Sequence, residues 1–145
     1  MLNPRTKTAP GKRKITFKDF DIGFRRHPVK GSLIVKKDDD SIKQALKYLV
    51  LSNTYERPFS PAYGTDLRNK LFDLMDPLTS SDIEFAITTA VKNFEPRVSL
   101  QNNGFGQGVY VTDSPEENGI TVKIVYTAIT TGVTSSLDIN LNRVR

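Results

Sequence analysis

The chain has 145 residues, a formal net charge of +5 and no cysteine. This length suits one domain with one core, and the absence of cysteine excludes disulfides, thiolate zinc sites and cysteine nucleophiles. Because the sequence has no apolar run long enough to span a bilayer, and Met1 to Lys18 lacks the apolar core of a signal peptide, we expect neither a membrane span nor secretion.

The start of the chain is strongly basic. Residues 1–18 carry six Lys and Arg and no acidic residue, which leaves a net charge of −1 for residues 19–145. We expect residues 1–18 to form a basic arm that is disordered when free and orders against an acidic partner, followed by one domain over residues 19–145. The arm could bind phosphate through charge alone, but it has no aromatic residue before Phe17 for stacking on bases, so nucleic acid is the less favoured partner.

Two short apolar segments follow the arm. Lys14–Phe20 alternates in polarity and Leu33–Val35 is an apolar run, and both are typical of weak strands or loop anchors. His27 lies between them beside Pro28 and is the only histidine in the chain. Without a second histidine or a cysteine it does not form a zinc site, so we expect no metal.

Three helices are predicted next. The first follows Asp38–Asp40 and opens on a capping box of Ser41 and Gln44. The second runs over Leu67–Met75, is capped by Thr65 or Asp66, and is stopped by Asp76-Pro77. The third opens at Thr79 or Ser81 and ends before Pro96. Its apolar positions form one stripe at helical spacing, which predicts the core face: Ile83, Ala86, Ile87, Ala90, Val91 and Phe94.

Beyond Arg97 the apolar period changes to two. Alternating segments at Val98–Leu100, Val109–Val111, Ile120–Ile129 and Leu137–Val144 predict an antiparallel sheet. The fold class is therefore α+β, with three helices followed by a mainly antiparallel sheet of about four strands, one face of which the third helix covers. Glycines near Gly104 lack the Gly-Lys-Ser/Thr ending of a phosphate loop, and we expect no cofactor.

Two segments far apart in the sequence carry the most specific pattern. In Glu56-Arg57-Pro58-Phe59-Ser60-Pro61-Ala62-Tyr63-Gly64, the prolines favour a rigid loop, which we expect Phe59 and Tyr63 to pin down. Arg57, Pro58 and Gly64 complete this loop scaffold. In Glu95-Pro96-Arg97, the proline ends a helix and fixes two opposite charges. These charges form either a docking point or a helix stop with two solvated charges.

The order of these motifs resembles the baseplate wedge proteins of contractile phage tails. This is a small "lysozyme-like" family that also serves tailocins and type VI secretion, and whose members initiate the tail sheath. The resemblance rests on the two segments above together with Tyr63-Gly64-Thr65-Asp66-Leu67, Leu71-Phe72, Asp76-Pro77-Leu78-Thr79 and Asn93-Phe94. It covers roughly Ile42 to Val144, and residues 1–40 match nothing that we can name.

The resemblance implies a structural virion protein of the tail baseplate, assembled in the host bacterial cytoplasm and present in six copies. Its partners would be other baseplate wedge proteins and the tail sheath protein, and the arm could clamp onto the tail tube or a neighbouring baseplate protein. Glu95, Pro96 and Arg97 would anchor the chain on a helical core bundle of larger wedge proteins, since Arg97 can make a bidentate contact. The resemblance leaves open whether the machine is a phage, a tailocin or a secretion system.

The last strand suggests how sheath assembly would start. Leu137, Ile139, Leu141 and Val144 fall in a strand with little protection by charge or proline. If this strand lies at a sheet edge, its main-chain groups can pair with a strand of the first sheath subunit.

Two functions of other classes compete with this hypothesis. A glycosidase would use Glu56 and Glu95 as its acid and base, and it needs two carboxyl groups about 5–9 Å apart, one with a raised pKa. The adjacent Arg57 and Arg97 favour the ionised forms, and the chain has no tryptophan to stack on a sugar, so we expect no enzyme activity. The other alternative is an adaptor that binds nucleic acid or protein through the basic arm.

Overall fold

The computed structural model describes residues 17–73, 76–101, 108–114, 116 and 118–142. The chain divides into two compact units between Asp38 and Asp39. We refer to residues 17–38 as the hairpin unit and to the described residues from 39 to 142 as the larger unit. The expected basic arm falls almost wholly outside the described residues, so the boundary at residue 18 stays a prediction.

The hairpin unit contains strands β1 (Lys18–Phe20) and β2 (Val35–Lys37), paired antiparallel with Phe20 opposite Val35. Main-chain hydrogen bonds continue the ladder beyond the strands, since Asp21 N–H donates to the Ile34 carbonyl at 2.9 Å. Both apolar segments predicted as weak strands therefore take part in this hairpin.

The larger unit begins with helix α1 (Asp39–Leu51). Asp39 and Asp40 lie in its first turn, and Ser41 is a buried residue of the same turn. The capping box predicted for Ser41 and Gln44 is therefore wrong, because the helix starts before Ser41. The aspartates do face the helix N-terminus, where negative charge is favourable.

Helix α2 (Leu67–Lys70) is shorter than the predicted Leu67–Met75, and residues 74–75 are not described. Helix α3 (Pro77–Phe94) starts earlier than predicted. Asp76 is its N-cap residue and accepts a hydrogen bond from Thr79 N–H at 2.7 Å. Pro77 suits the first helical position, where a missing N–H costs nothing. Asp76-Pro77 therefore starts α3, and the start predicted at Thr79 or Ser81 is wrong.

The predicted apolar stripe of α3 faces the core, with Ile83, Ile87, Ala90 and Val91 buried. The helix ends at Phe94, just before Pro96, as predicted. None of the helices within the described part of the chain combines the length and apolar character needed to cross a membrane.

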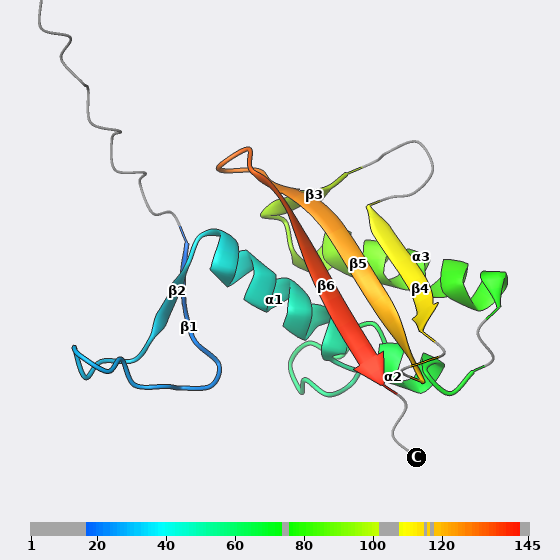
Figure 1. Cartoon of the computed structure of the whole chain (residues 1–145), viewed down its shortest axis with the longest axis horizontal. Coiled ribbons are helices and arrows are strands. Elements are labelled where there is room, and N and C mark those ends of the chain that lie inside the picture. Colours follow the sequence, from blue (N-terminus) through cyan, green and yellow to red (C-terminus); the bar gives the residue numbers. More distant parts are fainter. Residues whose placement is uncertain (1–16, 74–75, 102–107, 115, 117, 143–145) are drawn as a thin grey trace, which may run out of the picture. The chain divides into compact units, whose positions relative to one another are not determined.

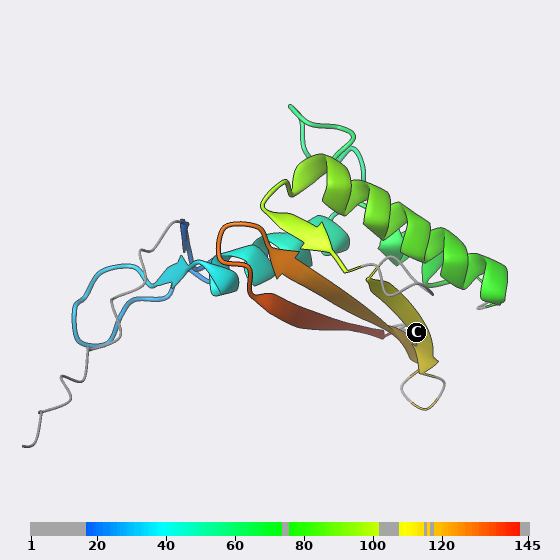
Figure 2. The same ribbon diagram turned by 90° about the horizontal axis from the view of Figure 1, so that it is seen from above.

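The sheet of the larger unit has four antiparallel strands: β3 (Val98–Leu100), β4 (Val109–Ser114), β5 (Gly119–Ala128) and β6 (Thr134–Asn142). Strand β5 is central: β6 pairs along one side of it, while β3 and β4 pair with successive parts of its other side (Figure 1). Helix α3 packs against β3 and β4, α1 packs against β6, and both helices lie on one face of the sheet (Figure 2). The predicted α+β fold class is confirmed.

The core is formed between this face and the two long helices. Alternate side chains of β5 are buried there: Ile120, Val122, Ile124, Tyr126 and Ala128. The Tyr126 hydroxyl donates a hydrogen bond to an Asp39 carboxylate oxygen at 3.0 Å, so the one polar atom of this buried ring has a partner at the start of α1.

Candidate functional site

The two motifs that stand far apart in the sequence meet in space. The Arg57 guanidinium carbon lies 3.7 Å from the centroid of the Tyr63 ring, within the range of a cation–π contact. On α3, the Phe94 ring lies 5.3 Å from that of Tyr63. Glu95 and Arg97 follow directly, and we call these five residues the corner. The loop after α1 is thereby fixed to the end of α3.

Within the corner, Glu95 and Arg97 bind one another. Arg97 donates from Nε and Nη2 to the two carboxylate oxygens of Glu95, at 2.5 and 2.7 Å. The Glu95 residue is only 6% exposed. A carboxylate that is withdrawn from water needs an opposite charge and hydrogen bonds in place of those from water. The Arg97 guanidinium provides both for Glu95. The alternative of two solvated charges is therefore wrong.

The corner also changes the ionisation of its tyrosine. Burial raises the pKa of Tyr63 above its ordinary value, and the Glu95 carboxylate acts in the same direction. The positive charges of Arg57 and Arg97 act against this rise. Tyr63 is therefore neutral throughout the physiological pH range, and its ring presents an uncharged face to Arg57.

The loop from Asn53 to Asp66 is held by its own polar groups. The Asp66 carboxylate accepts hydrogen bonds from Thr54 N–H at 2.8 Å and from the Thr54 hydroxyl. Asp66 stands at the N-cap of α2, but its side chain makes no capping bond there. Glu56 accepts bonds from the main chain and side chain of Asn53, at 3.0 and 2.9 Å. These contacts support the predicted rigid loop.

Gly64 is required where this loop returns to the end of α1. Its φ is +126°, and a Cβ added there would lie 2.6 Å from the Ser52 carbonyl oxygen. Only glycine has both the conformational freedom and the small volume that this position needs.

Phe59 does not pin the loop. Its side chain is fully exposed, at 100%, and Tyr55 in the same loop is also highly exposed. The prediction for Phe59 is therefore wrong, whereas Tyr63 does make the expected anchoring contact. The outcome is a rigid loop that presents aromatic surface to solvent.

Strand β6 forms one edge of the sheet. Val125 of β5 donates its N–H to the Gly108 carbonyl and accepts a bond from Gln101 N–H, both on the side of β5 away from β6. Val125 and its cross-strand partner Ser136 are therefore a non-hydrogen-bonded pair. It follows that the N–H and C=O of Ser136 point away from β5. By alternation the same holds for Thr134, Asp138, Asn140 and Asn142.

This register changes which residues face a partner strand. Leu137, Ile139 and Leu141 direct their main-chain groups to β5, and Ile139 is buried in the core. Val144 is outside the described residues. The outward main-chain groups belong to Ser136, Asp138 and Asn140, which sequence reasoning missed. No other described strand pairs with this side of β6 (Figure 1).

The strand on the other side of the sheet is covered in part. Val111 of β4 donates its N–H to the Glu84 carboxylate of α3 at 3.1 Å. A helix side chain thus takes up an edge N–H that would otherwise bind a foreign strand. The two edges therefore differ: a helix side chain takes up an edge N–H of β4, whereas no described strand pairs with the outer side of β6.

Over the part of the chain that the structure describes, no group of three or more His, Cys, Asp or Glu side chains is placed to hold a metal ion. The Nδ1 atom of His27 accepts hydrogen bonds from the N–H groups of Val29 and Lys30, at 3.3 and 3.2 Å. His27 is thus a turn residue of the hairpin unit.

Comparison with known proteins agrees with the motif pattern. Residues 36–133 match the model of the family described as baseplate wedge protein gp25. The baseplate wedge protein gp25 of Enterobacteria phage T4 is 43% identical over 58 residues, which is 40% of this chain and 44% of that protein. The chain thus spans less than half the length of this curated relative.

Two solved structures share the fold. A putative tail lysozyme from Geobacter sulfurreducens has a TM-score of 0.67 and 17% identity, over 79% of this chain and 98% of that chain. A chain of the anti-feeding prophage baseplate has a TM-score of 0.59 and 16% identity, over 86% of this chain and 83% of that chain. At these identities the likeness concerns the fold alone.

Proposed function

The chain belongs to the baseplate wedge protein gp25 family, and from that premise we propose that it is a structural subunit that joins the baseplate wedge to the first ring of tail sheath. Family membership makes it a component of a contractile-tail baseplate, which is the location that the sequence predicted. In this proposal, the corner holds the subunit on the other wedge proteins, and β6 receives a strand of the sheath protein.

The observation that carries the sheath proposal is the open edge of β6. This strand has nine residues, no proline and no lysine, and Asp138 is its only charged residue, so few of the devices that blunt an edge are present. Its outward groups at Ser136, Asp138 and Asn140 recur every second residue, which is the repeat that an added strand needs. Backbone bonds would supply affinity, and the alternate side chains would set the register.

For anchoring, we propose that the corner acts through the loop it holds. Because Glu95 and Arg97 bind one another, their main effect is to fix the end of α3 and the ring of Tyr63. The fully exposed Phe59 then supplies an aromatic side chain on a rigid support, of the kind that dominates binding energy at protein interfaces. The proposed acceptor is the helical core bundle of larger wedge proteins, with six copies of this chain per baseplate.

We do not propose a glycosidase. Glu56 is bound to Asn53, and both carboxylate oxygens of Glu95 are bound to Arg97. A general acid must instead hold a proton for the leaving group, which requires an environment that favours its neutral form. The family to which the chain belongs is named for its place in the baseplate and not for a reaction.

Ser136→Pro tests the sheath proposal. Proline removes the outward N–H of Ser136 and leaves the ladder to β5 intact, and Ser136→Ala is the matched control because it keeps that N–H. Each lost main-chain bond costs about 0.5–1.5 kcal/mol, and the loss recurs in every copy. In reconstituted baseplates incubated with purified sheath protein, we expect the sheathed fraction counted by electron microscopy to fall about tenfold or more for Ser136→Pro.

The alanine control should sheathe normally, and circular dichroism should show both variants folded. If folded Ser136→Pro enters baseplates and these acquire sheath as often as the wild type, the β6 edge does not start the sheath.

A further inference from the structure

The hairpin unit presents a face that combines apolar and basic side chains. We propose that this face, formed by Lys18, Phe20, Leu33, Val35 and Lys37, docks onto an acidic, apolar surface of a neighbouring baseplate protein. Most of the hairpin unit precedes the family match, which begins at residue 36, so the contact would be an addition to the function shared by the family. The proposal rests on the proposed function only in taking the partner from the baseplate.

The register of the hairpin segregates its charges. Phe20 lies opposite Val35 and Lys18 lies opposite Lys37, so these four side chains share one face. Leu33 is two residues before Val35 and pairs with Arg26, so by alternation it follows on the same face. The next pair, Asp19 opposite Lys36, falls on the other face. The docking face is therefore apolar and basic, with no acidic residue among its members.

Among the described residues of the hairpin unit, the one buried acidic residue is paired with two cations. Asp21 is buried, accepts from Arg25 Nε at 3.0 Å, and has Lys36 Nζ at 3.8 Å. The hydrogen bond from Arg25 lowers the pKa of Asp21 below its ordinary value, against the effect of desolvation. Asp21 thus serves to hold the turn together, and its charge does not offset the lysines of the docking face.

Main-chain hydrogen bonds within the hairpin define the geometry of this face. At its base, Asp38 N–H donates to the Phe17 carbonyl at 3.0 Å, and Phe17 N–H donates to the Asp38 carboxylate at 3.1 Å. Nearer the turn, Ile34 N–H donates to the Arg25 carbonyl at 3.0 Å. A preformed surface loses little conformational entropy on binding.

This unit has almost no apolar core of its own. Of its described residues, only Asp21 is buried, whereas Phe20 is 61% exposed, Leu33 42% and Val35 40%. A two-stranded hairpin alone is marginally stable in water, and exposed apolar patches on soluble proteins mark contact surfaces. Covering these side chains would therefore stabilise the hairpin and the contact together.

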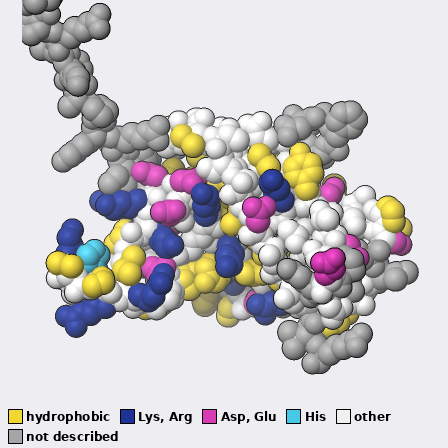
Figure 3. Space-filling view, viewed as in Figure 1, with side chains coloured by type: hydrophobic (Ala, Val, Ile, Leu, Met, Phe, Trp, Pro, Cys, Tyr) yellow, Lys and Arg dark blue, Asp and Glu magenta, His cyan; other side chains and the backbone are white. Residues whose placement is uncertain are grey.

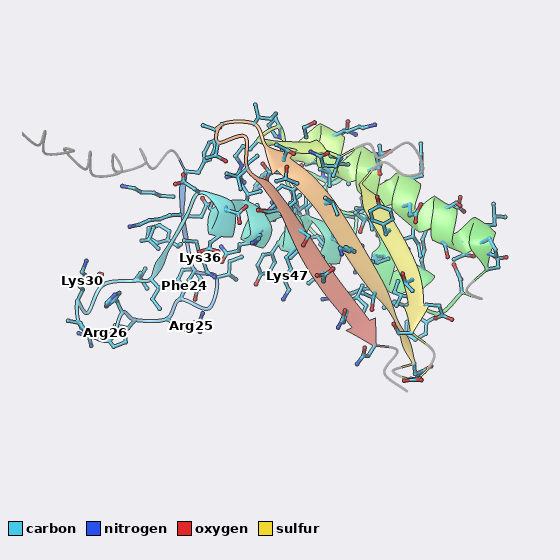
Figure 4. The ribbon with its side chains drawn as sticks, turned by 45° about the horizontal axis from the view of Figure 1, so that its top comes forward. Phe24, Arg25, Arg26, Lys30, Lys36 and Lys47 are labelled. Atoms are coloured by element: carbon cyan, nitrogen blue, oxygen red, sulfur yellow. The ribbon has the colours of Figure 1, made fainter. Side chains whose placement is uncertain are left out.

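The net charge of the hairpin unit indicates which charge the partner surface carries. The described residues 17–38 contain six basic and three acidic side chains: Lys18, Arg25, Arg26, Lys30, Lys36 and Lys37 against Asp19, Asp21 and Asp38. Figure 3 shows dark blue and yellow atoms interspersed over this unit, and Figure 4 shows Phe24 beside Arg25, with Arg26 and Lys30 farther along the same loop. An acidic surface complements this pattern.

The apolar residues favour a protein over a nucleic acid. Binding to single strands depends on aromatic rings that stack on bases. The docking face has a single aromatic ring, that of Phe20, and its other apolar members, Leu33 and Val35, are aliphatic and cannot stack on bases. Aliphatic side chains gain most when they are buried against other apolar groups, which the core of a protein interface supplies.

The experiment uses the full-length chain and purified wedges assembled without it. Lys18→Glu/Lys37→Glu should weaken binding to these wedges about tenfold or more at low ionic strength, and the loss should shrink at high ionic strength. Lys47→Glu/Lys123→Glu changes the charge equally at exposed positions of the larger unit and should leave the affinity within about twofold. Phe20→Ser/Val35→Ser should weaken binding at both ionic strengths. Thermal unfolding of each variant shows whether the larger unit remains folded.

Carbodiimide cross-linking identifies what the hairpin touches. We expect Lys18 or Lys37 to become linked to an aspartate or glutamate of another wedge protein. Links only to a second copy of this chain, unchanged affinity of both hairpin variants, or a hairpin-dependent affinity for DNA that exceeds that for wedges would each overturn the proposal. Hairpin variants should reduce incorporation, whereas Ser136→Pro should reduce sheathing after incorporation, so the two proposals fail separately.

Discussion

Gly64→Ala is expected to destabilise the larger unit by about 3 kcal/mol or more. An alanine Cβ at this position would lie 2.6 Å from the Ser52 carbonyl oxygen and 2.8 Å from the Asn53 carbonyl carbon. These atoms are main chain, and Ser52 O also accepts the N–H of Thr65 at 3.1 Å, so they cannot move without breaking the closure of the loop. The measurement is the free energy of unfolding from chemical denaturation.

Gly132→Ala serves as the reference for a glycine of positive φ that has room for a Cβ. Gly132 also has a positive φ, of +64°, but an added Cβ would meet nothing within 4 Å. Its replacement should therefore cost only about 1 kcal/mol, which is the strain of a left-handed residue. Equal losses for the two variants would show that the packing of Gly64 against Ser52 contributes nothing.

Arg97→Ala is expected to cost about 2–4 kcal/mol, because it leaves the buried Glu95 carboxylate without its partner. The expected loss of stability is smaller than for a fully buried ion pair, because the Arg97 side chain is 23% exposed and water screens its charge. Arg97→Lys keeps the charge but cannot make two parallel bonds, so it should fall between alanine and the wild type. Lys47→Ala, at an exposed position of α1, is the control and should change stability by less than about 0.5 kcal/mol.

A double-mutant cycle that combines Arg97→Ala with Glu95→Gln measures the coupling free energy between these two side chains, apart from the contacts that each makes with other residues. A coupling of about 1 kcal/mol or more between the two positions would support the internal role. If instead Arg97→Ala is as stable as the wild type and yet no longer enters wedges, Arg97 contacts the partner directly. That outcome would support a direct docking contact by Arg97, as the family resemblance implies for Glu95, Pro96 and Arg97.

Much of the fold could be predicted from periodicity. The α3 stripe around Ile87 and the alternation along β5 are strong patterns, because each repeats over several turns or residue pairs. The starts of helices were less certain, because Asp39 and Ser41 compete for one start, and Asp76, Thr79 and Ser81 for another. All of these side chains can cap, so local sequence alone does not decide between them.

The site was predictable in composition but not in geometry. The sequence predicts that Phe59 pins the loop together with Tyr63, but the pattern of prolines and aromatic residues does not tell which of the two rings packs and which is exposed. The bonds between Glu95 and Arg97 depend on how the chain turns at Pro96. Which groups of β6 point outward depends on the hydrogen-bonding phase of its pairing with β5, which the alternation of side chains does not reveal. Such non-local contacts leave no periodic pattern to recognise.

The most direct test of the account is a cryo-electron microscopy map of the assembled baseplate with its first sheath ring. We expect a strand of a sheath subunit to run beside β6, with main-chain hydrogen bonds to Ser136, Asp138 and Asn140. If that side of β6 is instead covered by residues of this chain itself, or faces solvent beneath a fully formed sheath, the proposed role of the edge is wrong.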